Sequence, residues 1–136
     1  MFEKFLSTIG IGSMKVDTIV EKSHILYGET LSGQIFIDCG RSEQQIDYIN
    51  LEVIKRMEGY REDSDFDVTN DSIAKHTIEV VGDIKLKETR IIPFELKTDE
   101  AWDIGREDAK LFLRTSVHIT NAVDVHDEDE IFFSRI

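Results

Sequence analysis

Acidic side chains are the residues of this 136-residue sequence that most invite a chemical role. Asp63, Asp65 and Asp67 follow the spacing D-x-D-x-D, which suits calcium because that cation prefers hard carboxylate oxygens. An EF-hand loop begun at Asp63 requires glycine at its sixth position and glutamate at its twelfth. The sequence has Val68 and Ala74 there. This stretch is therefore not an EF-hand, and we interpret it as a solvated run of charge.

A second acidic group, formed by Asp124, Asp127 and Asp129, lies close to the end of the sequence. Loops at the end of a β-domain can wrap a cation, and either acidic group could supply its oxygen ligands. A calcium- or small-ligand-binding domain is therefore the alternative to the function favoured below. The favoured interpretation predicts no metal and no cofactor.

Histidine and cysteine give little support for zinc binding or catalysis. His24, His76, His118 and His126 show neither H-x-x-x-H nor H-x-H spacing, and a single cysteine cannot build a structural zinc site. The sequence also lacks a G-x-S-x-G elbow and the glycine patterns of nucleotide-binding loops. Cys39 falls on the apolar face of an expected strand and is interpreted as a core thiol. We predict no catalytic residues and no enzymatic activity.

Charge and composition limit the classes of partner and compartment. The net charge is -12, and residues 58–71 and 121–136 hold most of it. Such a surface repels nucleic acid and anionic membranes. No stretch approaches the roughly 18 apolar residues of a membrane span, and the first residues do not resemble a secretory signal. We therefore expect a cytoplasmic protein without a membrane span that binds no nucleic acid.

The elements expected to carry these residues are strands, because apolar and polar residues alternate along most of the chain from Met14 onward. A turn is expected at residues 27–29, a loop at residues 59–71, and an edge strand or bulge at Pro93, because proline cannot donate to a central ladder. Six or seven strands in one domain, residues 1–136, predict an all-β, antiparallel two-sheet sandwich. The expected strands cover residues 14–21, 30–39, 45–57, 72–81, 83–90, 91–96 and 111–120.

The first residues have a different period. Phe2, Phe5, Leu6 and Ile9 have the spacing of one helical face, and glycines at positions 10 and 12 end the pattern. We therefore expect a short helix within residues 1–12. It either covers one end of the sandwich or docks on a partner.

Residues 124–136 are expected to form an acidic exit segment that follows the last strand. One interpretation is a solvated tail at residues 127–130. The other is that Asp124, Asp127 and Asp129 pair with basic residues of a partner or of the same chain, with Arg106, Lys110 and Arg114 as the nearest candidates in the sequence. Only a buried or networked arrangement of such pairs would matter energetically.

Several separated stretches resemble the N-terminal domain of the bacterial sporulation-control proteins. They are LYGETLSG at residues 26–33, QQIDYI at 44–49, IPFEL at 92–96, VHITNAVD at 117–124 and DEDEI at 127–131. The resemblance implies an immunoglobulin-like sandwich of the arrestin type that acts as a non-enzymatic adaptor or regulator in sporulation and cell shape. Members usually have a proline near Val125 and continue into a second arrestin-like domain, so we interpret the chain as a short or truncated member.

Protein binding is the mode of action that these observations favour. A sandwich offers strand edges with unpaired backbone groups, and strand addition is a common way for it to bind a partner. The alternative docking site is the apolar row around Phe132 and Phe133. The partner is another protein or a second copy of the chain. The candidate interaction residues are Phe2, Phe5, Asp124, Asp127, Asp129, Phe132 and Phe133.

Overall fold

The computed structural model describes residues 14–38, 45–60, 66–80, 89–103, 109–120 and 122–135, with the side chains of residues 58–60, 66 and 67 left out. Within these ranges the chain forms eight strands and one 3-10 turn. They are β1 (Lys15–Val20), β2 (His24–Leu26), β3 (Thr30–Asp38), β4 (Ile46–Tyr60), β5 (Phe66–Glu79), β6 (Thr89–Lys97), η1 (Glu100–Trp102), β7 (Ala109–Ile119) and β8 (Val125–Ser134). The predicted helix at residues 1–12, Cys39 and the predicted strand at residues 83–90, apart from its last two residues, lie outside the described part.

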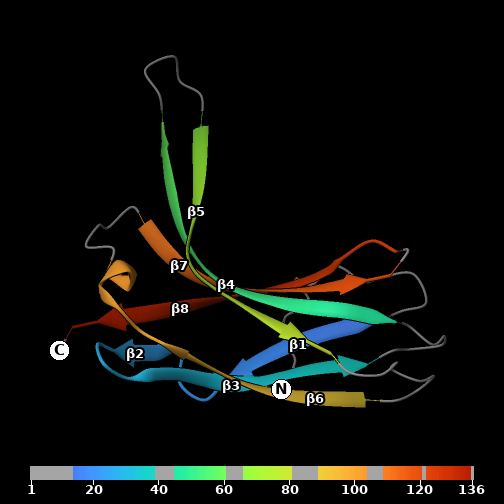
Figure 1. Cartoon of the computed structure of the whole chain (residues 1–136). Coiled ribbons are helices and arrows are strands. Elements are labelled where there is room, and N and C mark those ends of the chain that lie inside the picture. Colours follow the sequence, from blue (N-terminus) through green and yellow to red (C-terminus); the bar gives the residue numbers. More distant parts are fainter. Residues whose placement is uncertain are drawn as a thin grey trace.

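Two sheets face each other in two layers, which confirms the predicted β-sandwich (Figure 1). One sheet has the order β1-β3-β6 and the other the order β2-β8-β7-β4-β5. The strand pairs are antiparallel except for β2 and β8, which run parallel. The sheets therefore form a sandwich in which one short strand departs from the predicted antiparallel pattern.

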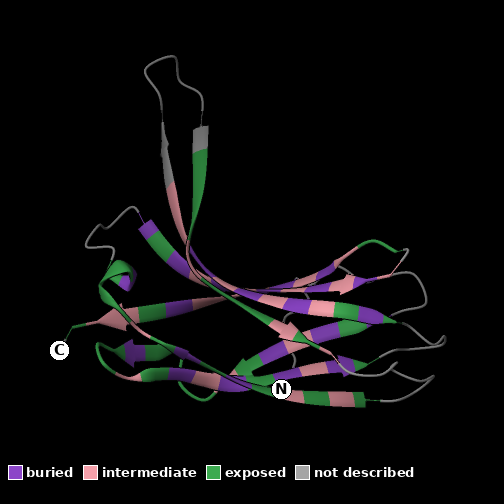
Figure 2. Cartoon of the chain, in the orientation of Figure 1, coloured by how far each residue is buried: buried purple, intermediate pink, exposed green. Residues whose placement is uncertain are grey.

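The core lies between the layers because successive side chains of a strand point to opposite faces. Buried residues alternate with intermediate or exposed ones along β3 and β7, and Figure 2 shows the buried positions on strands of both layers. Trp102 in the η1 turn is also fully buried. Burial of each large apolar side chain contributes about 1.5–3 kcal/mol. The inward rows include Leu31, Ile35, Ile37, Ile49, Leu51, Val53, Leu113 and Val117.

Two local predictions about turns and edges are confirmed. Gly28 has a φ of 89°, and the backbone N–H of Glu29 donates to the carbonyl oxygen of Leu26 over 2.9 Å. Glycine adopts such a φ without the steric cost that other residues meet. Pro93 lies on β6, an edge strand of the three-stranded sheet, where its missing N–H costs no central ladder bond.

The loop predicted at residues 59–71 is largely wrong. β4 continues to Tyr60 and β5 begins at Phe66, so the two strands form a long hairpin that projects away from the two layers (Figure 1). Pairing within a hairpin satisfies backbone N–H and C=O groups without any apolar core. The polar composition therefore indicates that these residues are exposed to solvent, but it does not indicate their backbone conformation.

The predicted solvated tail at residues 127–130 is also wrong, because residues 125–134 form β8. β8 lies between β2 and β7 in its sheet, and its Val125 and Ile131 are buried. These two apolar residues hold the strand against the core, while β7 supplies its ladder of hydrogen bonds. The acidic residues between them are therefore built into the sheet.

Candidate protein-interaction surface

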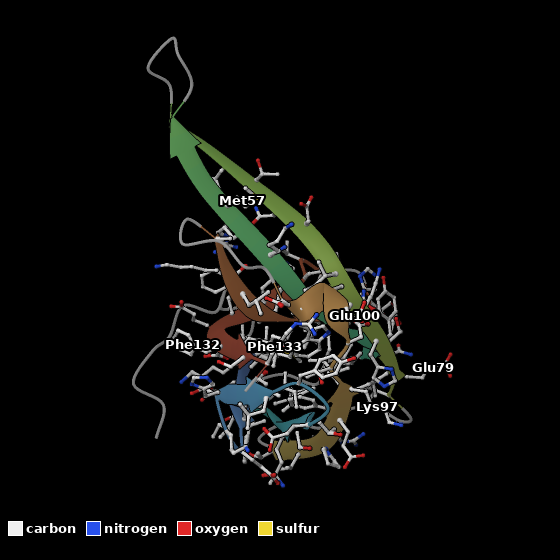
Figure 3. All side chains as sticks on the ribbon, turned by 90° about the vertical axis from the view of Figure 1, so that its left-hand side faces the viewer. Met57, Glu79, Lys97, Glu100, Phe132 and Phe133 are labelled. Carbon is white, nitrogen blue, oxygen red and sulfur yellow. The ribbon has the colours of Figure 1, made fainter. Side chains whose placement is uncertain are left out.

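An exposed group of apolar residues gathers where β2 and the end of β8 meet. Phe132 is 49% exposed, Tyr27 46% and Leu26 38%, and Phe133 is half-buried on the face of β8 opposite to Phe132. We call these four residues the aromatic edge surface. Figure 3 shows Phe132 and Phe133 near the end of β8, next to β2. Because β2 is the outermost strand of its sheet, this surface borders a strand edge.

Short backbone contacts fix β2 beside β8. The N–H of Tyr27 donates to the carbonyl oxygen of Ser134 over 2.8 Å, and the N–H of Phe132 donates to that of Ser23 over 2.8 Å. These bonds lie on either side of the three-residue parallel pairing. A strand of three residues has no apolar alternation that sequence reasoning can detect, and β2 was not predicted.

Ring contacts divide the two phenylalanines into an anchor and an exposed residue. The ring of Phe133 lies 6.3 Å from the ring of buried Trp102 and meets Tyr27 edge-on, also at 6.3 Å. The ring of Phe132 lies 6.2 Å from that of His24 and remains half-exposed. Aromatic pairs at these separations stabilise their relative positions. Phe133 therefore holds the surface to the core, and Phe132 offers its ring to solvent.

Arg135 lies at the border of this surface. Its guanidinium stands 5.2 Å from the centre of the Tyr27 ring, and its Nε donates to Asp103 Oδ2 over 2.6 Å. The hydrogen bond to Asp103 raises the pKa of the guanidinium further above its ordinary value. The cation over the ring restrains Tyr27 without covering it.

A buried carboxyl group joins the two sheets farther along β8. Asp127 is 2% exposed, and its Oδ2 accepts a 2.9 Å hydrogen bond from the backbone N–H of Thr18 on β1. The hydroxyls of Thr18 and Thr115 lie 2.6 Å apart beside this contact. Because β1 is an edge strand of its own sheet, the Asp127 carboxyl takes the place of a neighbouring strand.

The protonation of Asp127 differs from that of an ordinary aspartate. Burial and, to a smaller extent, the nearby charge of Asp129 raise its pKa to about 7, although the hydrogen bond from the Thr18 N–H acts in the opposite direction. Asp17 adds a further negative charge close by. Burial disfavours the charged carboxylate, so near neutral pH the group is divided between its two forms.

Glu128 is the centre of an ion-pair network on the outer face of the same sheet. Arg114 Nε donates to Glu128 Oε2 over 2.8 Å, and Arg56 Nη2 donates to Oε2 and Oε1 over 2.9 and 3.1 Å. Arg56 also lies 4.3 Å over the Phe112 ring and bonds Asn70 Oδ1 through its Nε over 2.7 Å. Residues from β5, β4, β7 and β8 are thus tied together in a partly buried row.

The two arginines set the charge of Glu128. Burial alone raises its pKa, but the hydrogen bonds from Arg56 and Arg114 outweigh that effect and hold the pKa below its ordinary value. Glu128 is therefore ionised when Asp127, the preceding residue, is divided between its charged and neutral forms.

His118 and His126 lie farther along the outer face. His118 Nδ1 is 2.9 Å from Asp124 Oδ1, and its ring stacks on Tyr48 at 4.8 Å. Ser116 Oγ is 2.8 Å from Nδ1 of His126. The serine hydroxyl and the aspartate thus contact different imidazoles, so these residues do not form the relay of a serine hydrolase.

Of the candidate acidic residues, Asp127 and Asp129 lie close together, whereas Asp124 has a different partner. Asp124 contacts His118, whereas Asp127 is buried against β1. Among the described residues no three histidine, cysteine, aspartate or glutamate side chains could hold a metal ion. The other acidic group, Asp63, Asp65 and Asp67, and the predicted contacts Phe2 and Phe5 lie outside the described side chains.

The predicted pairing in cis takes place, but through a different residue. Arg114 bonds Glu128 and not one of the three aspartates that were predicted. Thr18, Arg56 and Glu128 were missed. The sequence signal for β8 was an alternation with a period of two, in which Val125, Asp127, Asp129 and Ile131 lie on one face of the strand. That signal is weak because its middle positions are acidic.

The fold and this surface define a single-chain β-sandwich of the immunoglobulin-like class, with no helix in its described residues long and apolar enough to cross a membrane. A family model described as SpoOM protein matches residues 2–134. The chain therefore belongs to the Spo0M family.

Two known proteins place the chain more closely. It is 29% identical over 135 residues to the sporulation-control protein spo0M of Bacillus subtilis strain 168, covering 96% of this chain and 50% of that protein. The crystal structure of Spo0M from Bacillus subtilis matches with a TM-score of 0.75 and 26% identity, covering 89% of this chain and 49% of the other. The chain thus spans about half the length of the relative that it matches.

Proposed function

We propose that this chain is a non-enzymatic cytoplasmic regulator related to sporulation control, and that it acts by binding a protein partner through the aromatic edge surface. The observation that carries the proposal is the exposure of Phe132 and Tyr27 beside the outermost strand of a sheet. The role in sporulation is supported by membership of the Spo0M family and by the name of the Bacillus subtilis relative.

The physical properties of the surface suit a protein partner. Exposed aromatic residues supply much of the binding free energy at protein interfaces, because they bury a large area with few rotatable bonds. Phe133 packs on Trp102 and meets Tyr27 edge-on, so Tyr27 stands on a supported base, while Phe132 points to the opposite face of β8 beside His24. At the edge of β2, the N–H of Leu26 donates to Glu29 Oε1 over 2.8 Å and its carbonyl oxygen accepts from the N–H of Glu29, so these backbone groups are already bonded and the exposed side chains make the contact with the partner.

The test compares two exposed apolar residues at opposite ends of β8. Phe132→Ser removes the exposed ring, whereas Val123→Ser changes a residue that is 69% exposed just before β8 begins. Immobilised wild-type chain is incubated with lysate of its host, and retained proteins are identified by mass spectrometry. We expect one partner to be retained by the wild type and by Val123→Ser, and to be lost with Phe132→Ser. Equal retention by both variants would exclude the aromatic edge surface as the binding site.

A folding control accompanies this comparison. Both substitutions lie at exposed positions, so the midpoint of urea unfolding should change little in either variant. Light scattering of the wild type after size-exclusion chromatography shows whether the partner is a second copy. Truncation after Asp124 would remove β8 and is therefore not a suitable test of binding.

The sporulation role needs a separate cellular test. The matching half of the Bacillus subtilis relative is replaced by this chain, and heat-resistant spores are counted. We expect the exchange to preserve the spore count of the parent strain, and Phe132→Ser within it to reproduce the count of a strain that lacks the relative. If the wild-type exchange behaves like the strain lacking the relative, the proposed role in sporulation is wrong, whatever the binding result.

A further inference from the structure

The outer face of the three-stranded sheet carries apolar residues. Along β1, β3 and β6, every second side chain points away from the five-stranded sheet. Among these outward residues, Ile91 is 50% exposed and Ile19 is 37% exposed. Pro93 is also exposed, and Phe36 is half-buried. We call these four residues the outer apolar patch, and none of them belongs to the aromatic edge surface.

The strand register brings the outer apolar patch together. Ile19 is paired with Gln34, and Gln34 is paired with Pro93, so these three residues form one row across the sheet. In the next row, Phe36 is paired with Ile91. Directly paired side chains lie about 5 Å apart, and the same face repeats after about 7 Å along a strand. The patch therefore extends over two neighbouring rows of one face.

Two glutamates lie beside the patch on the same outer face. The backbone N–H of Glu21 donates to the carbonyl oxygen of Ser32 over 2.9 Å, and Ser32 is paired with Glu95. This row adjoins the row of Ile19 and Pro93, because each strand returns to the same face after two residues. Both glutamates are exposed, and neither forms an ion pair within the described part of the chain. One end of the patch is therefore bordered by carboxylates without a paired cation.

Both edges of this sheet are poor sites for strand addition. In the middle of β1, the backbone N–H of Thr18 already donates to Asp127 Oδ2 over 2.9 Å. On β6, Pro93 has no N–H to donate to a neighbouring strand. A partner of this sheet must therefore bind its face through side chains. The face is three strands wide, so its outer strands lie about 10 Å apart, which is close to the diameter of an α-helix.

We infer that the outer face of the three-stranded sheet binds an amphipathic α-helix of another protein, with apolar side chains on the outer apolar patch and lysine or arginine beside Glu21 and Glu95. One helical turn rises about 5.4 Å, so residues at i, i+4 and i+7 can follow the successive rows of the face. Apolar side chains of such a helix bury the patch, and its cations neutralise the unpaired carboxylates.

Charge selects a basic helix over the other occupants. The outward positions of this sheet hold four carboxylates, those of Asp17, Glu21, Asp38 and Glu95, against two lysines, at positions 15 and 97. An acidic helix is therefore repelled. A second copy of this chain fits poorly because its net charge is -12.

The test uses a labelled synthetic peptide in which leucines at helical spacing form one face and lysines form the other. One control peptide has the same residues in an order that gives no apolar helical face, and a second has glutamate in place of each lysine. Fluorescence anisotropy with the full chain should give saturable binding of the first peptide alone. Absence of saturable binding up to about 1 mM, or equal binding of either control peptide, overturns the inference.

Paired substitutions test the apolar contact. Ile19→Ser with Ile91→Ser should weaken affinity for the amphipathic peptide by roughly 10-fold or more, because two apolar contacts are lost. Val68→Ser with Val123→Ser changes residues that are 43% and 69% exposed outside this face, and it should change affinity by less than about 2-fold. Circular dichroism checks that all variants are folded. Equal weakening by the two pairs would overturn the inference.

A second set of variants tests the charge contact. Glu21→Gln with Glu95→Gln should weaken affinity by roughly 3- to 10-fold, as expected for two exposed charge contacts, and should reduce the sensitivity of binding to salt. Asp71→Asn with Glu100→Gln removes the same charge from exposed positions on other elements and should change affinity by less than about 2-fold. Equal weakening by both pairs would show non-specific attraction to an acidic chain and overturn the inference.

NMR of the isotope-labelled chain locates the bound peptide. The largest changes in amide chemical shift should fall on β1, β3 and β6, and largest changes on β2 and β8 would overturn the inference. Phe132→Ser should leave peptide binding unchanged, because Phe132 lies on the other sheet. Failure of this inference and failure of the proposed function are therefore distinguishable.

Discussion

The two acidic stretches of the chain have similar compositions and opposite environments. Residues 58–71 carry six acids and residues 121–136 carry five, with one base in each. The described part of the first stretch lies on the projecting hairpin of β4 and β5, where residues 68–71 are exposed. The second forms β8 inside a sheet, with one carboxyl buried and another bonded to two arginines. Charge density alone therefore does not indicate where a segment lies.

The difference arises from what surrounds the acids in sequence and in space. β8 begins at buried Val125 and includes buried Ile131. Arg114 on β7 and Arg56 on β4 donate hydrogen bonds to Glu128. Residues 68–72 of the hairpin include no buried residue. Apolar residues at the correct spacing favour incorporation of a segment into the sheet. Cationic side chains must then offset the desolvation free energy of its buried carboxylates.

Charge reversal should separate the two stretches most strongly. Glu128→Lys places a third cation beside Arg56 and Arg114, and we expect it to lower the free energy of unfolding by about 2–4 kcal/mol. Asp71→Lys on the exposed hairpin should change it by less than about 0.5 kcal/mol. Urea unfolding at neutral pH, followed by circular dichroism, measures both values. Similar losses in the two variants would mean that β8 is no more sensitive to charge than the hairpin.

Stability should fall as pH rises through neutrality because of Asp127. Its folded pKa of about 7 lies above the ordinary 3.8, so the folded chain keeps a proton that the unfolded chain has released. The contribution of the protonated group is complete below about pH 4 and is lost as pH rises through about 7. Between about pH 5 and pH 8 we expect a loss of about 2–3 kcal/mol.

The control for this pH dependence is Asp127→Asn. An amide oxygen can still accept the hydrogen bond from Thr18 but carries no titrating proton. Urea unfolding across the same pH range should therefore give a flatter profile for this variant. A wild-type profile that is equally flat would contradict burial of a titrating carboxyl at the sheet junction.

Removal of one arginine should have a smaller effect. Arg56→Met keeps an apolar contact with Phe112 and leaves Arg114 as the partner of Glu128, so the expected loss is about 1–2 kcal/mol. The pKa of Glu128 should rise toward its ordinary value, because one of the two donors that lower it is gone. NMR titration of the Glu128 carboxyl carbon measures this change. An unchanged titration midpoint would mean that Arg114 alone sets the pKa.

The smallest effect is expected on the exposed hairpin. Val68 is 43% exposed, and Val68→Thr replaces it by another β-branched residue that suits a strand. The free energy of unfolding should change by less than about 0.5 kcal/mol. A larger loss, measured by urea unfolding, would show that the hairpin contributes apolar burial to the fold.

Much of the fold could be predicted because its strands alternate clearly. Leu31, Ile35 and Ile37 occupy one face of β3, and all three are buried as their spacing predicts. The turn at Gly28 and the edge position of Pro93 follow from backbone properties of single residues. β2 was not predicted because a strand of three residues is too short to show a periodic pattern. β8 was not predicted because acidic residues occupy the middle of the strand.

The candidate surface was predicted only in part. Phe132 and Phe133 were both predicted as interaction residues, and Phe132 is exposed, whereas Phe133 packs against Trp102. Asp127 was expected either in a solvated tail or in a pair with a basic residue, and it is buried against the backbone N–H of Thr18. Nothing in its sequence neighbourhood marks Thr18 as its partner.

The sequence by itself determined the strands that alternate, the turns made by glycine, the edge marked by proline and the family of the chain, because these depend on local backbone properties or on ordered residue identity. Only the tertiary structure decided which acidic stretch is partly buried and which carboxyl has a raised pKa. The contact between Thr18 and Asp127 joins residues 109 positions apart. Such contacts exist only after two sheets have packed, and burial in that packed state sets the pKa of the carboxyl.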